Sequence, residues 1–346
     1  MAGMSLGLEI VLAALGVALI ALAAVDVFVT VLTTRGGGPV SSRVTSAIWR
    51  AVLALRAWPN FHRILSYAGA FTAILTVASW ILLFWAGWLL IFAAGPESVV
   101  RATTGEAAGL WARVYYSGYT LFTLGLGDYR PEGAPWQVLT ALAVGNGFMV
   151  ISLSGSYLIP LVSAATTKRS IALQIRMLGA SPSDILTSSW DGQGFSGLSQ
   201  HLIALFPMIV QAGQQHLAYP VLHYFQSADA DVALPVQIAR LREALDLLEH
   251  GVAPQSRLPG TTTRPLRGAV ELFGKIVQQP RAERDRDSGS EPDLELLRRA
   301  GIPIADEAEY RHALAQRRDE RQTMLALVEY SGWSWEDVAG KNESRA

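Results

Sequence analysis

The chain of 346 residues has no cysteine and little charge. The absence of cysteine excludes a fold that is held together by disulfides. Only 16% of the residues are charged, against about 25% in an ordinary soluble domain, and 51% are hydrophobic, which excludes a disordered chain. The formal net charge is −1, and no block of Lys or Arg stands out that could neutralise a run of phosphates. We therefore expect no nucleic-acid partner.

The few charges are unevenly distributed. Residues 1–166 carry 14 of the 57 charged side chains, and residues 167–346 carry the other 43. Three apolar stretches in the first half are long enough to cross a bilayer, which takes about 20 residues of helix. They cover about residues 6–33, 67–94 and 136–165. The first is too long for a signal peptide and lacks a basic start. The pattern predicts an all-α membrane protein with three transmembrane helices, followed by a helical, water-soluble half.

Basic residues indicate the orientation in the membrane. The segment between the first two stretches holds five arginines and no acid, and Lys168, Arg169 and Arg176 follow the third stretch. Because basic loops stay in the cytoplasm, we expect a multi-pass protein of the cell (inner or plasma) membrane. Its N-terminus would be outside and its C-terminus cytoplasmic. Residues 47–58 alternate apolar side chains with arginine, which predicts an interfacial helix; an ordinary connector is the alternative.

The loop between the second and third stretches is too long for a tight turn. Its middle, Trp111–Phe122, is apolar and aromatic but too short to cross a membrane, so it predicts a re-entrant half-helix. A glycine-containing run, Thr123–Pro131, follows it. Irregular backbone at membrane depth is tolerated only where it is buried in protein or lines a water-filled path. A half-helix and alternating glycines between two spans therefore predict an ion filter.

The residue types in this run suit a cation. A dehydrated cation needs a cage of oxygens, and consecutive carbonyls supply one if they all point the same way. That requires alternating backbone conformations, some of which only glycine adopts without strain. Gly125 and Gly127 occupy alternate positions, and the hydroxyl and carbonyl of Thr123 can add the innermost ring. The C-terminal end of the half-helix favours a cation, and Asp128 adds negative field at the outer mouth.

The run Thr123–Asp128, with the letters TLGLGD, resembles the filter of the bacterial potassium channel family of the two-helix pore-loop type. Thr120 precedes it, Tyr129 and Pro131 follow it, and the resemblance covers about residues 66–166. It implies passive conduction of K⁺, with no enzyme activity and no organic cofactor. The filter residues that it implies are Thr123, Leu124, Gly125, Leu126 and Gly127, with K⁺ held at the first four.

The resemblance also implies residues that support the filter, namely Asp128, Tyr115, Tyr119 and Thr120. The sequence departs from the family pattern at three positions. Leu126 replaces the usual filter aromatic, Tyr119 stands where some members place a glutamate that pairs with the filter aspartate, and Tyr115 stands where they place tryptophan. We expect the hydroxyls of Tyr115 and Tyr119 to brace Asp128 in a filter that is less stiff than usual.

Each chain contains one such loop, whereas a cage around an ion needs several. The expected working unit is therefore a cyclic homotetramer. The resemblance places the gating hinge and gate at Gly145, Gly147 and Pro160 in the third span. Asn146 would either face the cavity or bond to another helix. The first span is additional to the two-helix pore and has no row of arginines, so we expect no voltage sensor.

We divide the chain into three parts. Residues 1–65 would form the first transmembrane helix and the interfacial helix. Asp26 would either be a functional carboxylate within the membrane or lie near the interface, within reach of Arg35. Residues 66–166 would form the pore domain, from outer helix through pore helix and filter to inner helix. Residues 167–346 would form a mostly helical regulatory or assembly domain.

The expected helices of the last part follow from local signals. Pro207 and Pro220 are expected to break one helical pattern, and residues 261–263 to form a loop. Asp306 and Glu309 resemble a capping box that opens a helix to about Tyr330. A charged, flexible linker is expected near 280–292. No nucleotide-binding, Walker or EF-hand motif occurs, so neither a cytoplasmic ligand nor a gating stimulus is predicted.

Three functions remain open from the sequence. The first is a potassium-selective channel, and the second is a weakly selective channel for monovalent cations. The third is a non-conducting receptor or scaffold that uses a pore-like domain only to form tetramers.

Overall fold

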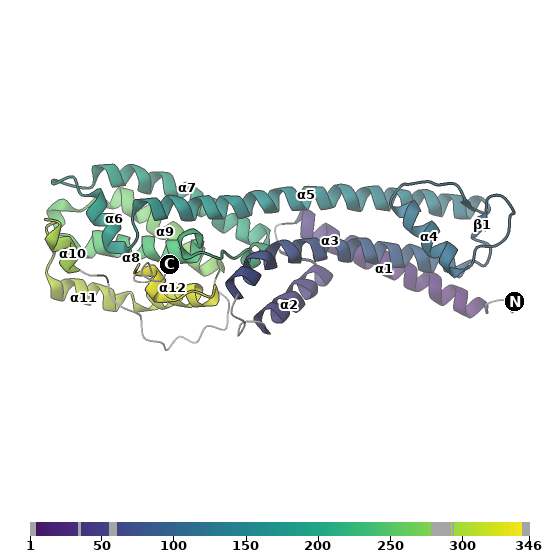
Figure 1. Cartoon of the computed structure of the whole chain (residues 1–346), viewed down its shortest axis with the longest axis horizontal. Coiled ribbons are helices and arrows are strands. Elements are labelled where there is room, and N and C mark those ends of the chain that lie inside the picture. The colour runs from purple at the N-terminus through teal and green to yellow at the C-terminus, as the bar shows by residue number, and fades with distance from the viewer. Residues whose placement is uncertain (1–4, 34–35, 55–60, 278–291, 293, 341–346) are drawn as a thin grey trace. The chain divides into compact units, whose positions relative to one another are not determined.

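The computed structural model describes residues 5–33, 36–54, 61–277, 292 and 294–340. Most of them are helical (Figure 1), and two short strands make up the one sheet in this described part. Three of the helices are long and apolar enough to cross a membrane: Leu6–Leu32, Leu65–Ala94 and Ala134–Leu178. The prediction of a mostly helical membrane protein with three spans is thus confirmed.

The chain forms two compact units, one made of Met1–Leu53 and Ala70–Leu161 and the other of Ala54–Gly69 and Val162–Ala346. The elements of the first unit are α1 (Leu6–Leu32), α2 (Pro39–Ala54), β1 (Val99–Arg101), α4 (Leu110–Leu121) and β2 (Tyr129–Pro131). The helices α3 (Phe61–Ala94) and α5 (Ala134–Leu178) contribute residues to both units.

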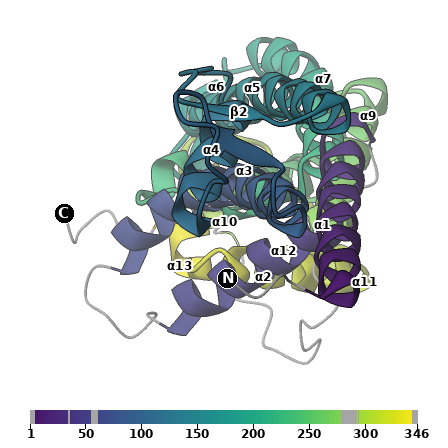
Figure 2. The same cartoon turned by 90° about the vertical axis from the view of Figure 1, so that its right-hand side faces the viewer.

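Helices α1 and α3 approach each other closely at a pair of glycines. A methyl group added to Gly16 would lie 2.7 Å from the carbonyl oxygen of Gly87, and one added to Gly87 would lie 2.9 Å from the carbonyl oxygen of Gly16. Small residues allow the backbones of membrane helices to meet in this way. Figure 2 shows α3 with α1 along one side and α4 along another, so α3 joins the additional span to the loop region.

Helix α2 begins at a carboxylate that belongs to α1. Asp26 is fully buried and accepts hydrogen bonds from the backbone N–H groups of Val40 (2.6 Å) and Ser41 (3.1 Å), in the first turn of α2. It also accepts from the Ser41 hydroxyl and from the indole N–H of Trp80 on α3 (2.7 Å). An anion at a helix N-terminus satisfies free N–H groups and complements the dipole. Asp26 therefore ties three helices together.

Residues 47–54 of the helix predicted at 47–58 belong to α2, which starts eight residues earlier than that prediction and ends at Ala54. Asp26 explains the early start, since it supplies the cap from outside the segment. Arg35, the partner expected for Asp26, and residues 55–60 lie outside the described residues.

The second unit is built from short helices around the end of α5. They are α6 (Pro182–Ser189), α7 (Ser196–Ala218), α8 (Leu234–Asp246), α9 (Gly260–Val277), α10 (Leu294–Arg299), α11 (Glu307–Gln316), α12 (Arg318–Tyr330) and α13 (Trp335–Val338). Short 3-10 turns cover Pro220–Tyr224, Ala230–Val232 and Pro254–Ser256, and a π-helical turn, Leu247–Gly251, follows α8.

Helix α8 is the buried centre of this unit, because all of its residues are buried. Its charged side chains are paired inside the core: Arg242 contacts Asp246 at 3.1 Å, and Glu243 contacts Arg321 of α12 at 3.0 Å. A buried charge without a partner is strongly destabilising. The pairing therefore fixes how α8 is rotated and where α12 docks against it.

The helix boundaries of the second unit differ from the sequence predictions in two places. Helix α7 runs through Pro207, which lies on the exposed face of α7, where its ring disturbs no buried contact. Residues 261–263 belong to α9 rather than to a loop, and Thr263 is buried in that helix. Pro220 does end the pattern, as predicted, because it opens a 3-10 turn.

The capping residue predicted at Asp306 is confirmed. Its carboxylate accepts hydrogen bonds from the N–H groups of Ala308 and Glu309, each at 3.0 Å. The helix that it opens stops at Gln316 and not near Tyr330, because Arg317 leaves the helical conformation with φ −107° and ψ 17°. The predicted linker at 280–292 lies, except for its last residue, outside the described residues.

We expect Asp26→Asn to destabilise the protein by about 1–3 kcal/mol, because an amide has one acceptor oxygen in place of two and leaves buried donors unsatisfied. The measurement is thermal unfolding of the purified protein in detergent. Glu9→Gln is the matched control, since Glu9 is a half-buried acid on the same helix. Equal melting temperatures for the two variants would contradict the capping role of Asp26.

Candidate pore loop

A short helix lies between the second and third spans. It is α4, whose 12 residues begin one residue before the segment expected for the half-helix, at Leu110, and cover that segment except for Phe122. At 1.5 Å per residue it is about 18 Å long, which is less than the roughly 30 Å of a hydrocarbon core. Its last six residues, from Tyr116 to Leu121, are all buried.

Hydrogen bonds anchor α4 to both neighbouring helices. The indole N–H of Trp85 on α3 donates to the hydroxyl of Ser117 at 3.1 Å. On the other side, the hydroxyls of Tyr116 and Thr140 of α5 share a hydrogen bond of 2.7 Å. These contacts join buried polar groups that would otherwise be costly in an apolar environment. They fix the height and rotation of α4 between the two spans.

Arg113 of α4 lies at the C-terminal end of α3. Its guanidinium donates to the carbonyl oxygens of Ala93, at 3.2 Å, and Pro96. The last carbonyls of a helix have no partner within the helix and carry partial negative charge, so a cation is favourable there. Arg113 therefore anchors the first half of α4, as the hydroxyl contacts anchor the second half.

The end of α4 has the geometry of a Schellman motif. The N–H of Leu124 donates to the carbonyl of Tyr119 at 2.9 Å, and the N–H of Thr123 donates to the carbonyl of Thr120 at 3.0 Å. Thr123 has φ +60° and is the only non-glycine residue with positive φ in the described part of the chain. For a β-branched residue this conformation is a genuine outlier, costing about 1–3 kcal/mol, and such strain gathers at functional sites.

The backbone alternates after Thr123. Gly125 has φ +56° and Gly127 has φ +82°, whereas Leu124 and Leu126 lie outside the positive-φ region. An added methyl group would meet no atom within 4 Å at either glycine. Glycine is therefore required at these positions by the backbone conformation and not by a lack of space. Successive N–H groups of a backbone with alternating hand converge on one side, which leaves the carbonyl oxygens to the other side. Such a segment can surround a cation when copies of it are brought together.

Two short strands hold the outer end of the loop. Strand β2 pairs antiparallel with β1, and the carbonyl of Asp128 accepts from the N–H of Ala102 at 2.9 Å. The hydroxyl of Tyr119 donates to the carbonyl of Tyr129 at 2.7 Å. The Tyr119 hydroxyl therefore donates to the backbone one residue beyond Asp128 and not to the Asp128 carboxylate, although the Asp128 charge still acts on this phenol. Tyr115 does interact with the Asp128 carboxylate.

Gly147 of α5 packs against the end of α4. A methyl group on Gly147 would overlap the carbonyl oxygen of Leu121, whereas one on Gly145 would meet nothing within 4 Å. In this structure Gly147 therefore allows close packing of α5 against the end of α4. This contact can be recognised only from the tertiary structure. Helix α5 is continuous through both glycines and through Pro160. Asn146 bonds to another helix, because its side-chain oxygen accepts from the indole N–H of Trp88 at 3.2 Å.

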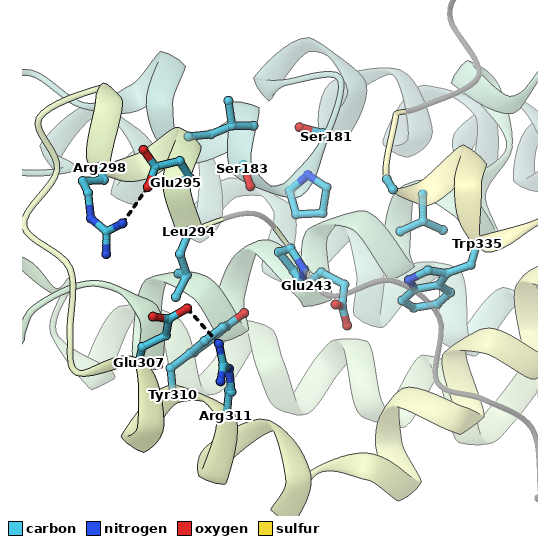
Figure 3. Close-up of a pocket in the computed structure, with 15 residues that line it drawn as sticks. Ser181, Ser183, Glu243, Leu294, Glu295, Arg298, Glu307, Tyr310, Arg311 and Trp335 are labelled. Atoms are coloured by element: carbon cyan, nitrogen blue, oxygen red, sulfur yellow. Dashed lines mark hydrogen bonds and ion pairs between the residues drawn. The ribbon is translucent and has the colours of Figure 1, made fainter.

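The second unit holds a cavity of about 590 Å³ (Figure 3). Its lining includes Tyr310 and Trp335 and the carboxylate of Glu243, whose pKa is raised by burial although the Arg321 guanidinium opposes the shift. The two guanidiniums that line it are already paired, at 2.6 Å in Glu295–Arg298 and at 3.0 Å in Glu307–Arg311. These paired charges favour no particular class of ligand.

Among the described residues, no group of three His, Cys, Asp or Glu side chains could hold a metal ion.

The chain is similar to a bacterial membrane protein over most of its length. The chain is 28% identical over 306 residues to a protein of Bacillus subtilis (strain 168) named "Uncharacterized membrane protein YdjJ". The match covers 88% of this chain and 89% of that protein. It extends over both units and agrees with the membrane character of the first. No protein-family model and no solved structure matches the chain.

We expect Gly147→Ala to lower the melting temperature in detergent strongly, because overpacking at a close backbone contact costs about 1–3 kcal/mol. Gly145→Ala is the matched control, two residues away on the same helix and open at its Cβ position. It should leave the melting temperature unchanged. If both variants melted together with the unmodified protein, the contact between α4 and α5 would be refuted.

Proposed function

We propose that this protein is a potassium-selective channel of the cell membrane that conducts K⁺ passively through the backbone of Thr123–Gly127. The observation that carries the proposal is the alternation of positive φ at Thr123, Gly125 and Gly127 directly after a helix too short to cross a bilayer. Carbonyl oxygens on one side of such a backbone can replace the hydration shell of the ion, as rings of carbonyls do in potassium filters.

Each part of the loop has a role in this proposal. K⁺ would bind the oxygens of Thr123, Leu124, Gly125 and Leu126, with the Thr123 hydroxyl at the inner end. The partly negative C-terminal end of α4 favours a cation beside it. The Asp128 carboxylate adds negative charge at the outer end, and the strand pair holds that end in place.

The working unit in this proposal is a homotetramer in the lipid bilayer. A single chain supplies one strand of oxygens, so a closed cage needs several copies around one axis. Leu124 and Leu126 are 64% and 56% exposed in the single chain, although both have apolar side chains. Neighbouring copies would cover them.

The inner helix α5 would line the path for the ion and carry the gate. Gly147 is held against the end of α4, so bending there would break a close contact beside the filter. Gly145 has free space around it, and Pro160 removes one hydrogen bond further along the helix. These positions make Gly145 and Pro160 the better candidates for the hinge and the gate.

A weakly selective channel for monovalent cations is the second candidate, because Leu126 has no polar atom that could brace the filter from behind. The non-conducting receptor or scaffold is the third outcome. In that case the exposed loop would serve only for contacts between copies.

We expect purified protein in liposomes to pass K⁺ and to exclude Na⁺, and we expect Gly125→Ala or Gly127→Ala to abolish that preference. A side chain at φ +56° or +82° is strained, so the backbone would leave the alternating conformation. The control is Gly109→Ala at the other end of α4, where φ is −71° and the Cβ position is open. The measurement is the ratio of K⁺ to Na⁺ flux. Unchanged ratios in both filter variants would overturn the filter assignment, and the absence of flux from the unmodified protein would favour the scaffold.

A further inference from the structure

The second unit holds another cavity, of about 350 Å³. Its walls come from three segments of this unit: Ser66 near the start of α3, the residues Ala165, Lys168 and Arg169 near the end of α5, and residues 225–232, called here the connecting segment, between α7 and α8. The volume is within the range of small-molecule sites, about 300–1,000 Å³. None of the lining residues belongs to the proposed filter.

The cavity lies at the depth of the lipid head groups. Residues 134–167 of α5 carry no charged side chain, and Lys168 is the first charge of that helix. Between Ser66 and Ala94, at the other end of the same span, α3 is about 42 Å long, which exceeds a hydrocarbon core of roughly 30 Å. Tyr67, beside Ser66, is 69% exposed, and tyrosine is enriched where membrane and water meet. Both helices have therefore left the hydrocarbon core at the level of the cavity.

Lys168 brings a buried positive charge to the cavity wall. Its side chain is 8% exposed, and its ammonium donates to the carbonyl oxygens of Phe225, at 2.7 Å, and Leu222, at 3.5 Å. An ammonium has three donors, and neutral carbonyls do not balance its charge. In the described part of the chain, no carboxylate forms an ion pair with Lys168. Because a buried cation without a counter-charge is costly, Lys168 favours an anion in the cavity.

The other charges of the lining leave this preference in place. Arg169 adds a second cation, on an exposed side chain next to Lys168. Asp229 is the one carboxylate among the described lining residues. It caps a 3-10 turn by accepting from the N–H of Asp231 at 2.9 Å, and in this described part it pairs with neither cation. The lining therefore carries more positive than negative charge.

Direct contacts join the walls of the cavity. A methyl group on Gly69 of α3 would lie 2.5 Å from the ring of Phe225, so glycine allows the connecting segment to approach α3. Lys168 of α5 holds the same segment through the Phe225 carbonyl. Further along, Arg176 of α5 pairs with Asp231 at 2.7 Å. The walls are thus arranged before any ligand binds, which reduces the cost of binding.

We propose that this cavity binds the phosphate group of an anionic phospholipid at the membrane surface. Basic pockets between membrane helices bind the head groups of such lipids. A phosphate would give Lys168 and Arg169 an anion whose oxygens accept charge-assisted hydrogen bonds. Phe225 and Val232 in the same lining offer apolar contact to the glycerol and acyl chains, which a free phosphate ion lacks. The proposal goes beyond ion conduction and holds whether or not the chain conducts K⁺.

The natural absence of cysteine allows occupancy of the cavity to be measured with one introduced thiol. Ala228→Cys places it at an exposed position of the lining, and Leu272→Cys on α9, 46% exposed and outside the lining, is the matched control. The full-length protein in detergent is labelled with a neutral maleimide in the presence of dioleoyl phosphatidylglycerol, dioleoyl phosphatidylcholine or inorganic phosphate. We expect phosphatidylglycerol to slow the labelling of Ala228→Cys and not of Leu272→Cys. The other two probes should protect at least about fivefold less well.

A second pair of variants tests the charges. Replacing Lys168 would also remove its hydrogen bonds to the connecting segment, so the test uses the exposed Arg169. In the Ala228→Cys chain, Arg169→Gln should raise the phosphatidylglycerol concentration for half-protection about fivefold, which is the effect of one basic residue near a membrane surface. Arg50→Gln is the matched control, because Arg50 is an exposed arginine of α2, in the segment predicted to be interfacial, and does not line the cavity. It should leave that concentration unchanged.

Three results would count against the proposal. Equal effects of Arg169→Gln and Arg50→Gln would show only the general attraction of basic residues to anionic lipid and would overturn the site. Protection by inorganic phosphate as strong as by phosphatidylglycerol would overturn the lipid as the source of the phosphate. The absence of protection by every probe would overturn the proposal altogether.

Discussion

The left-handed backbone of Thr123 is the constraint on which the rest of the pore loop depends. A positive φ at the end of a helix costs little conformational energy when the residue is glycine. Here the residue is a β-branched threonine, for which this conformation is strained. The surroundings must therefore hold the conformation. They do so through the two Schellman hydrogen bonds at the end of α4 and through the contact of Gly147 with the Leu121 carbonyl. The strained threonine places both a hydroxyl and a carbonyl at the inner end of the proposed filter, whereas a glycine would place only a carbonyl there.

The frame that holds α4 is made of polar contacts in an otherwise apolar unit. Indole and phenol groups of α3 and α4 donate to a hydroxyl and a carbonyl, and Arg113 covers the end of α3. Each of these groups would be costly if it were left unsatisfied away from water, so their partners fix the arrangement of the helices. The buried Asp26 acts in the same way at the other end of the unit. In this account the carboxylate in the first span is a structural cap and not part of an ion path.

The features that depend on local sequence were predictable, and those that depend on distant contacts were not. The hydropathy pattern located the three spans, because an apolar run of about 20 residues has the length that a helix needs to cross a bilayer. The apolar run before the glycines located α4 within one residue at each end, and Asp306 was identified as a cap from its own neighbours. By contrast, the early start of α2 depends on Asp26, which lies 13 residues before Pro39. The path of α7 through Pro207 depends on which face is exposed, and the target of the Tyr119 hydroxyl depends on how β2 pairs with β1. Each of these features depends on contacts with residues that lie more than one helical turn away in the sequence.

If the alternating backbone of Thr123–Gly127 selects K⁺ over Na⁺, the selectivity must appear in the reversal potential of the reconstituted protein. With K⁺ on one side of a planar bilayer and Na⁺ on the other, a tenfold preference for K⁺ shifts the reversal potential by about 59 mV toward the potassium potential. We expect a shift of at least that size. A reversal potential near zero, or no current at all from protein shown to be tetrameric, would contradict it.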